Sequence, residues 1–124
     1  MVPLNIASRK STKEDKVVYH LVIARQERLD FEQMSKLIAE RTTLSEYEVE
    51  FTLSELQDII IENLQLGRGI ELGRLGCIEP SINVKSVDNI NDINLKTIKK
   101  TRLIYKPSKS IKAALKNLKF KIKR

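Results

Sequence analysis

The side chains best suited to chemistry in this sequence are the lysines and arginines of its C-terminal half. Residues 63 to 124 hold 15 Lys and Arg against 4 Asp and Glu, a net charge of +11, whereas residues 1 to 62 hold 8 against 12, a net charge of −4. After Asp92 the chain carries 12 basic residues and no acidic one. This distribution is typical of a surface that faces phosphates, because the attraction grows with the number of phosphates neutralised. The alternative is a basic tail that is merely solvated.

Residues for catalysis or metal binding are scarce. His20 is the one histidine, and it lies within an apolar segment, where we expect a packed residue rather than a general acid or base. Cys77 is the one cysteine, which excludes an internal disulfide and a cysteine-based zinc site and predicts a small hydrophobic residue. The sequence shows no glycine-rich phosphate loop and no metal-ligand motif. We therefore expect a binding protein rather than an enzyme, without a cofactor or a metal.

Length and composition indicate one intracellular domain with tails. The 124 residues suffice for one domain but not for two ordinary ones. Aromatic residues make up only 5% and tryptophan is absent, so the core must consist of Ile, Leu and Val, and a small core often gains stability by dimerising. No stretch reaches the roughly 20 apolar residues that cross a bilayer, and no secretion signal is evident. We expect a soluble, cytoplasmic protein with no membrane contact.

The N-terminal part changes character at residue 17. Residues 1–16 are polar and include a charged run, which predicts a flexible lead-in. Residues 17–25, VVYHLVIAR, are rich in β-branched residues and predict a strand. We therefore expect the folded domain to cover residues 17–118, followed by a basic tail at residues 119–124.

Two helix-start signals predict a helical hairpin after this strand. Asp30 can cap the first helix with Gln33 bonding back to it, and Ser45 with Glu48 forms the same capping box for the second. Gly67 is suited to a left-handed cap where the second helix ends. This second helix carries more apolar residues than one partner needs, which predicts a further packing partner.

Alternating residues then predict a three-stranded antiparallel sheet. Residues 70–85 indicate a hairpin with one buried face, in which Pro80 favours an edge or a bulge. Residues 86–94 predict a connection, and residues 95–100 a short helical turn. Residues 101–106 predict a third strand whose apolar set, Thr101, Leu103 and Tyr105, points inward beneath a basic outer face.

A final helix completes an α+β domain. Pro107 ends the third strand, Ser108 can cap a helix, and apolar residues follow at helical spacing beneath a lysine-covered face. Because strands and helices do not alternate along the chain, an antiparallel α+β fold is favoured over a parallel sheet.

The order of elements from Asp30 onward resembles the HU/IHF family of bacterial histone-like DNA-binding proteins. Residues 70–78 resemble the family's strand and turn ending in Gly-aromatic-Gly-x-Phe, with Leu75 and Ile78 at the aromatic positions and Arg74 in place of the first glycine. Residues 105–116 are similar to the family's Phe-Lys-x-Gly-Lys-x-Leu-Lys stretch. The added N-terminal strand, the Lys-Pro-Ser junction and a short arm are similar to HU-like proteins of Bacteroides-type bacteria.

The resemblance implies an intertwined homodimer whose two sheets form a saddle for double-stranded DNA in the nucleoid. It implies phosphate contacts from Lys106, Lys109 and Lys112, and a basic surface extended toward the minor groove by further cations. Such contacts position DNA but read no sequence. The complete set of expected DNA-binding residues is Arg74, Lys85, Lys96, Lys99, Lys100, Arg102, Lys106, Lys109 and Lys112.

The arm departs from the family, whose Arg-x-Asn-Pro tip wedges a proline between base pairs. Residues 85–100 contain neither proline nor arginine. Ile90 and Ile93 are possible wedges, but Asp88 and Asp92 would repel phosphates, so we expect a turn of the fold and weak bending. RNA binding and protein assembly by a domain that has lost DNA bending remain alternatives.

Overall fold

The computed structural model describes all 124 residues, and the chain forms two compact units. Unit 1 consists of Met1–Leu29 with Ala113–Arg124, and unit 2 consists of Asp30–Lys112. Helix α3 (Lys109–Lys116) crosses the boundary between them. The extent of a DNA-binding domain at residues 17–118 stays a prediction, because compactness does not locate a binding function.

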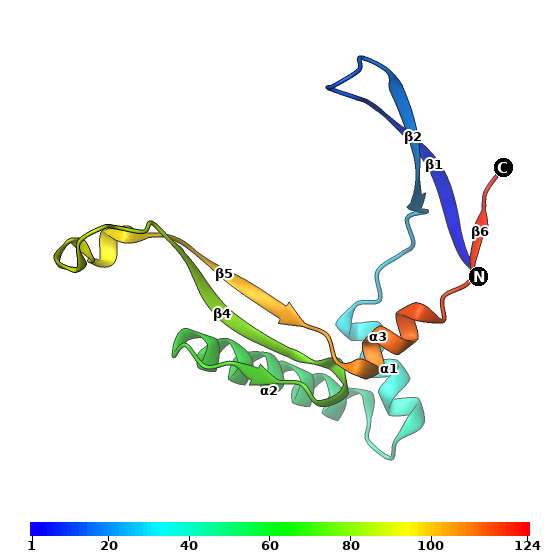
Figure 1. Cartoon of the computed structure of the whole chain (residues 1–124). Coiled ribbons are helices and arrows are strands. Elements are labelled where there is room, and N and C mark those ends of the chain that lie inside the picture. The colour runs from blue at the N-terminus through cyan, green and yellow to red at the C-terminus, as the bar shows by residue number, and fades with distance from the viewer. The chain divides into compact units, whose positions relative to one another are not determined.

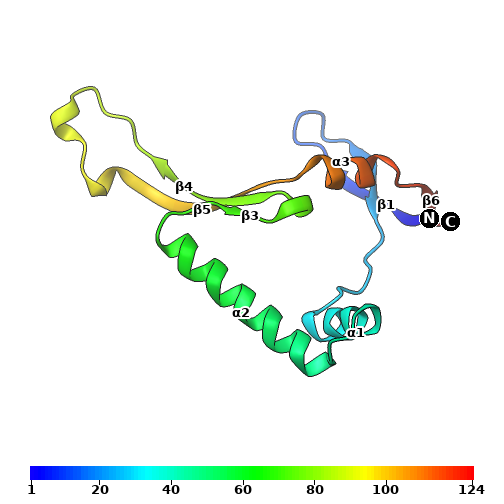
Figure 2. The same cartoon turned by 90° about the horizontal axis from the view of Figure 1, so that it is seen from below.

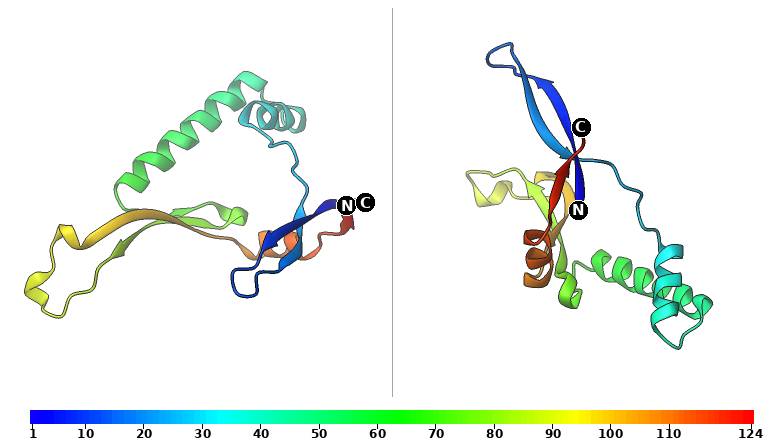
Figure 3. Two further views of the ribbon diagram at one scale, coloured as in Figure 1. Left: turned by 90° about the horizontal axis from the view of Figure 1, so that it is seen from above. Right: turned by 90° about the vertical axis from the view of Figure 1, so that its right-hand side faces the viewer.

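Unit 1 contains a three-stranded sheet in the order β2-β1-β6 (Figure 3). Strand β1 (Val2–Lys10) pairs antiparallel with β2 (Val17–Ile23), and parallel with β6 (Phe120–Ile122). The strand predicted from residue 17 is therefore present. The lead-in expected at residues 1–16 and the tail expected at residues 119–124 are instead largely strands. Each supplies backbone partners to the other, a pairing distant in sequence that local patterns do not reveal.

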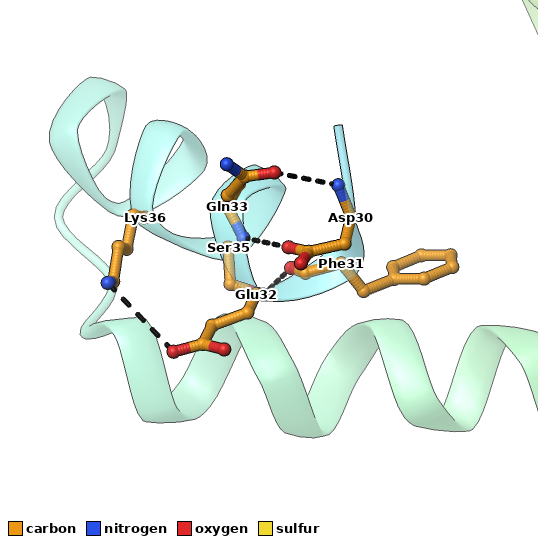
Figure 4. A network of polar contacts seen from close by, with 6 residues as sticks. All are labelled: Asp30, Phe31, Glu32, Gln33, Ser35 and Lys36. Atoms are coloured by element: carbon orange, nitrogen blue, oxygen red, sulfur yellow. Dashed lines mark hydrogen bonds and ion pairs between the residues drawn. The ribbon is translucent and has the colours of Figure 1, made fainter. Parts of the chain in front are cut away.

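The helical hairpin of unit 2 has the predicted caps. Helix α1 (Phe31–Arg41) begins after Asp30, whose carboxylate accepts from the backbone N–H of Gln33 at 2.8 Å while the Gln33 side chain accepts from the Asp30 N–H at 3.0 Å (Figure 4). Helix α2 (Glu46–Gln65) has the same box between Ser45 and Glu48. Ser35 is fully buried, and its hydroxyl donates to the carbonyl of Phe31 at 2.7 Å.

Helix α2 ends as its glycine predicts. Gly67 has a φ of +79°, and its N–H donates to the carbonyl of Leu64 at 2.9 Å. The N–H of Arg68 reaches back to the carbonyl of Asn63 at 3.1 Å. This pair of bonds satisfies carbonyls that a helix end otherwise leaves open. None of the three helices is long and apolar enough to cross a membrane.

The sheet of unit 2 has the predicted three antiparallel strands, in the order β3-β4-β5 (Figure 1). They are β3 (Ile70–Glu71), β4 (Cys77–Val84) and β5 (Ile98–Lys106). Strand β3 pairs only with Cys77 and Ile78, so at Pro80 the strand β4 is an edge on that side, as proline requires.

The face expected to be buried is exposed in the single chain. Ile82, Leu103 and Tyr105 are all exposed, whereas Ile104, expected on the outer face, is half-buried. The reason is the position of α2, which contacts the sheet mainly through β3 and diverges from the other strands (Figure 2). Buried apolar side chains are few: Leu4 and Ala24 in unit 1, and Val49 in unit 2.

Candidate nucleic-acid interface

The register of β4 and β5 sorts the sheet of unit 2 into two chemically different faces. Residues directly opposite each other on paired strands share a face. On one face, Lys100 pairs with Asn83, Arg102 with Ser81, and Lys106 with Cys77. We call this the basic face: Lys100, Arg102, Ile104 and Lys106 of β5 with Cys77, Glu79, Ser81 and Asn83 of β4.

The opposite side, which we call the apolar face, is almost free of charge. It holds Ile78 with Tyr105, Pro80 with Leu103, and Ile82 with Thr101. The predicted alternation along β5 is therefore correct in its assignment of residues to faces, although the apolar set is not covered in the single chain. Period-two alternation thus concentrates cations on one surface of the sheet.

Lys106 differs from the other expected DNA-binding residues because it has an acidic partner. Its Nζ lies 3.2 Å and 3.3 Å from the two carboxylate oxygens of Glu79. None of the other eight residues takes part in an ion pair. Glu79 was missed as part of the site, because only the strand register reveals that it neighbours Lys106 across the sheet. Lys100 and Arg102 are consequently the freest cations of the basic face.

A turn holds Arg74 beside the start of α3. The 3-10 turn Gly73–Leu75 follows β3, and the carbonyl of Leu75 accepts a 2.6 Å hydrogen bond from the Tyr105 hydroxyl. The hydroxyl of Ser108 donates to the carbonyl of Arg74. The exposed Arg74 side chain is therefore carried on backbone fixed against the junction between β5 and α3.

Close packing of this turn depends on glycine. Gly76 has a φ of +104°, and a Cβ there would overlap the carbonyl of Lys106 and the backbone of Pro107 and Ser108. Gly76, the second glycine of the family-like motif, thus lets the backbone of the turn lie against the backbone of residues 106–108.

Lys109 and Lys112 lie in the first turn of α3 and are exposed. Ser108 caps this turn as predicted, since its hydroxyl accepts from the N–H of Ile111 at 3.2 Å. Residues three apart are neighbours on a helix surface, so the two lysines form one cationic edge. The backbone of Arg74 lies beside the start of this turn, because its carbonyl accepts from the Ser108 hydroxyl.

The remaining expected residues, Lys85, Lys96 and Lys99, belong to the far end of the β4–β5 hairpin. The N–H of Lys85 donates to the carbonyl of Thr97 at 2.8 Å, which closes the connection. Lys99 lies where the register shifts, because Asn83 pairs with Lys100 while Val84 pairs with Ile98. This bulge inserts one unpaired residue into β5.

The connection itself is built from local bonds and projects its apolar residues outward. It contains the 3-10 turns Ile90–Asp92 and Leu95–Thr97, each begun by an asparagine that accepts a backbone N–H. Ile90 and Leu95 are 80% and 83% exposed. The expected turn is therefore present, but its aliphatic side chains are not packed into the fold.

The residues considered for other chemistry are dispersed. His20 is exposed in β2 rather than packed as expected, because β2 has substantial contacts only with its sheet neighbour β1. Cys77 is half-buried in β4. No group of His, Cys, Asp and Glu side chains is arranged to hold a metal ion.

Comparisons with known proteins agree with this architecture. A family model, HU-HIG, described as an HU domain fused to a wHTH, Ig or glycine-rich motif, matches residues 2–122. The crystal structure of a candidate bacterial DNA-binding protein from Bacteroides vulgatus ATCC 8482 is similar over 98% of this chain, with a TM-score of 0.61 and 11% sequence identity. This chain covers 47% of that protein, about half its length, and at such identity the likeness concerns the fold alone. No curated protein matches the chain.

Proposed function

The chain belongs to the HU-HIG family of HU domains fused to other motifs, and on this basis we propose that it binds double-stranded DNA through the cations of unit 2. The observation that carries the proposal is the basic face, where Lys100 and Arg102 project from one side of β5 without an acidic partner. The similar Bacteroides protein, described as a candidate DNA-binding protein, adds support.

The chemistry of these groups favours binding that is largely independent of sequence. Lysine ammonium and arginine guanidinium groups bind phosphate oxygens, and such contacts position a protein without reading bases. Each neutralised phosphate releases counterions, so the affinity should fall steeply with salt. We therefore propose an architectural, nucleoid-associated protein rather than an enzyme.

The exposed apolar surface of unit 2 supports a homodimer. Val49 is the one buried apolar side chain of this unit, while Phe51, Ile59 and Ile61 on α2 are exposed, as is Leu103 on the apolar face. A core this small does not offset the entropy of folding unless another surface covers it. A second copy that buries α2 and the apolar face leaves both basic faces free, which is the arrangement that a DNA saddle needs.

The tip of the hairpin favours modest bending. Its exposed Ile90 and Leu95 have the apolar character of a wedge, but they lack the rigid ring of proline, and Asp88 and Asp92 lie beside them. Carboxylates close to phosphates oppose insertion of the tip. We expect the phosphate contacts of the basic face and of the first turn of α3, rather than those of the hairpin tip, to dominate the affinity.

Fluorescence anisotropy of a labelled duplex across a salt series tests the proposal. We expect Lys100→Ala with Arg102→Ala to weaken binding about tenfold for each lost phosphate contact at 0.1 M salt, and to make the slope of log K against log salt less negative by about 0.9 per contact. The matched control is Arg9→Ala with Lys13→Ala, which removes the same charges from exposed positions of unit 1 that have no ion pair. The control should bind almost as the wild type does.

Three results would count against the proposal. An equal loss in both variants would mean diffuse attraction to net charge rather than a site on the basic face. No binding at low salt would remove the DNA function and leave protein assembly as the better account. Competition by structured RNA at lower concentrations than duplex DNA would favour the RNA alternative.

A further inference from the structure

The two edges of the unit 1 sheet are chemically unlike. The β6 edge is only three residues long, and Lys119, Lys121 and Lys123 lie within or beside it. Short length and lysines are the usual protections of an edge against pairing with another chain. The β2 edge has neither protection: it is seven residues long, and Val17–Ile23 contains no proline, lysine, arginine, aspartate or glutamate.

Both sides of β2 are apolar and accessible. All seven residues are exposed, with Tyr19 at 72%, and Val17, Leu21 and Ile23 share its face. A long edge of β-branched and aromatic residues with unpaired N–H and C=O groups is a template for another strand. The occupant must therefore be an extended, apolar segment that supplies backbone donors and acceptors.

We propose that this occupant is β2 of a second copy, paired antiparallel about a two-fold axis at His20. This register opposes Val17 to Ile23, Val18 to Val22, and Tyr19 to Leu21 of the second copy, so that every pair except the central one is apolar. Aromatic and β-branched cross-strand pairs of this kind stabilise sheets. The two sheets become one continuous sheet of six strands.

Charges beyond the ends of β2 select the antiparallel direction. The same register, continued one residue past the strand, sets Lys16 toward the small Ala24 of the second copy, so no two like charges face each other. Asp15 takes no part, because it lies in the β1–β2 turn with a φ of +53° and pairs with Lys10. A parallel, in-register pair would instead set Lys16 beside Lys16 and Arg25 beside Arg25. Opposite charges across a sheet stabilise it and like charges destabilise it, so a second copy fits this edge in the antiparallel direction.

The contact between two β2 edges does not depend on DNA binding. What it would do for DNA-bound protein rests on the proposed function. If unit 2 forms the dimer proposed above, each chain has two self-complementary surfaces, each used once. Two distinct two-fold contacts per chain link dimers to one another, in a closed dihedral assembly or an open row according to how the two axes are related. Dimers bound to DNA would then be linked through their unit 1 sheets.

Sedimentation velocity of the full chain without DNA, over a concentration series, tests the edge contact. Tyr19→Lys with Leu21→Lys opposes lysine to lysine in the register, and we expect it to reduce the assembly to half of the wild-type mass or less. Tyr19→Lys with Leu21→Glu opposes lysine to glutamate and should restore the wild-type mass. The control is Ile6→Lys with Ser8→Lys, which adds the same charges to the same face but on β1, directly across from these residues, and should leave the mass unchanged.

Each outcome decides the proposal. A wild-type mass for the double-lysine variant would overturn it, and so would a halved mass for the β1 control, because the face rather than the edge would then be the contact. Loss of DNA binding by the basic-face variant concerns only unit 2. The anisotropy and sedimentation experiments can therefore fail independently.

Cysteine cross-linking tests the register directly. In a Cys77→Ala background, His20→Cys places two thiols opposite each other at the axis, with Cα atoms about 5 Å apart and within disulfide reach. Val18→Cys places each thiol four residues along the strand from its counterpart, about 13 Å away. We expect mild oxidation to give covalent dimers of the first variant only. Equal cross-linking of both variants would contradict the register.

Discussion

The two three-stranded sheets of this protein differ in where their charged residues lie: on one face of the first sheet, and beyond the ends of the edge strand β2 in the second. In β3-β4-β5, cations alternate along β5 and collect on one face, while the other face is apolar. In β2-β1-β6, the strand β2 contains no lysine, arginine, aspartate or glutamate, and the charged residues next to it in sequence lie beyond its ends. The first sheet thus offers a face to a polyanion, and the second offers an edge to another strand. The position of charge within the strand period, rather than the net charge, separates these two surfaces.

The sheets differ also in how their strands are fixed. In unit 2 the turn Gly73–Leu75 is held against the β5–α3 junction by the hydroxyls of Tyr105 and Ser108. In unit 1 the side-chain contacts of the β1–β2 turn are solvent-exposed ion pairs such as Lys10–Asp15. Exposed pairs of this kind add little stability. The basic face therefore rests on a fixed turn, whereas the β2 edge rests mainly on backbone pairing.

The largest expected effect comes from Gly76→Ala. Its Cβ would overlap the Lys106 carbonyl at a φ of +104°, so the turn must separate from β5, and we expect a loss of more than about 3 kcal/mol in the free energy of unfolding. Gly73→Ala is the control: its φ is +60° but the space is open, so the loss should be about 1 kcal/mol. Urea denaturation followed by circular dichroism measures both. Equal losses would show that the turn is not closely packed.

A smaller effect is expected for Tyr105→Phe. The change removes the 2.6 Å bond to the carbonyl of Leu75 but keeps the ring, so unfolding should become easier by about 1 kcal/mol. Tyr47→Phe, on an 80% exposed ring of α2 without a hydrogen bond to the protein, should change nothing measurable. If both variants unfold as the wild type does, the hydroxyl does not hold the turn and the contrast between the two sheets weakens.

Local chemistry made much of unit 2 predictable. Capping boxes at Asp30 and Ser45, the left-handed Gly67 and the cap at Ser108 all depend on residues within three or four positions of one another. The alternation along β5 likewise assigned its residues to two faces correctly. These features follow from short-range periodicity and side-chain hydrogen bonding, which a sequence displays directly.

Pairings between distant segments were not predictable in the same way. The strand β1 finds a parallel partner in β6 at the other end of the chain, where the sequence predicted a flexible lead-in and a basic tail. The ion pair between Lys106 and Glu79 depends on the strand register, which the shift between Asn83 and Val84 modifies. The exposure of the apolar face depends on where α2 diverges. The pairing register of distant strands and the burial of a sheet face depend on the folded chain as a whole, and alternation along one strand does not predict them.

The smallest expected effect tests the one ion pair of the basic face. Glu79→Gln keeps the side-chain volume but frees Lys106 and removes a negative charge, so DNA affinity should rise about twofold, in line with the modest strength of an exposed pair. Glu14→Gln is the control, because it removes the same charge from an exposed pair with Lys16 in unit 1 and should leave affinity nearly unchanged. Anisotropy at fixed low salt measures both. A fall in affinity for Glu79→Gln would mean that the carboxylate orients Lys106 toward phosphate. The ion pair would then contribute to DNA binding instead of weakening it.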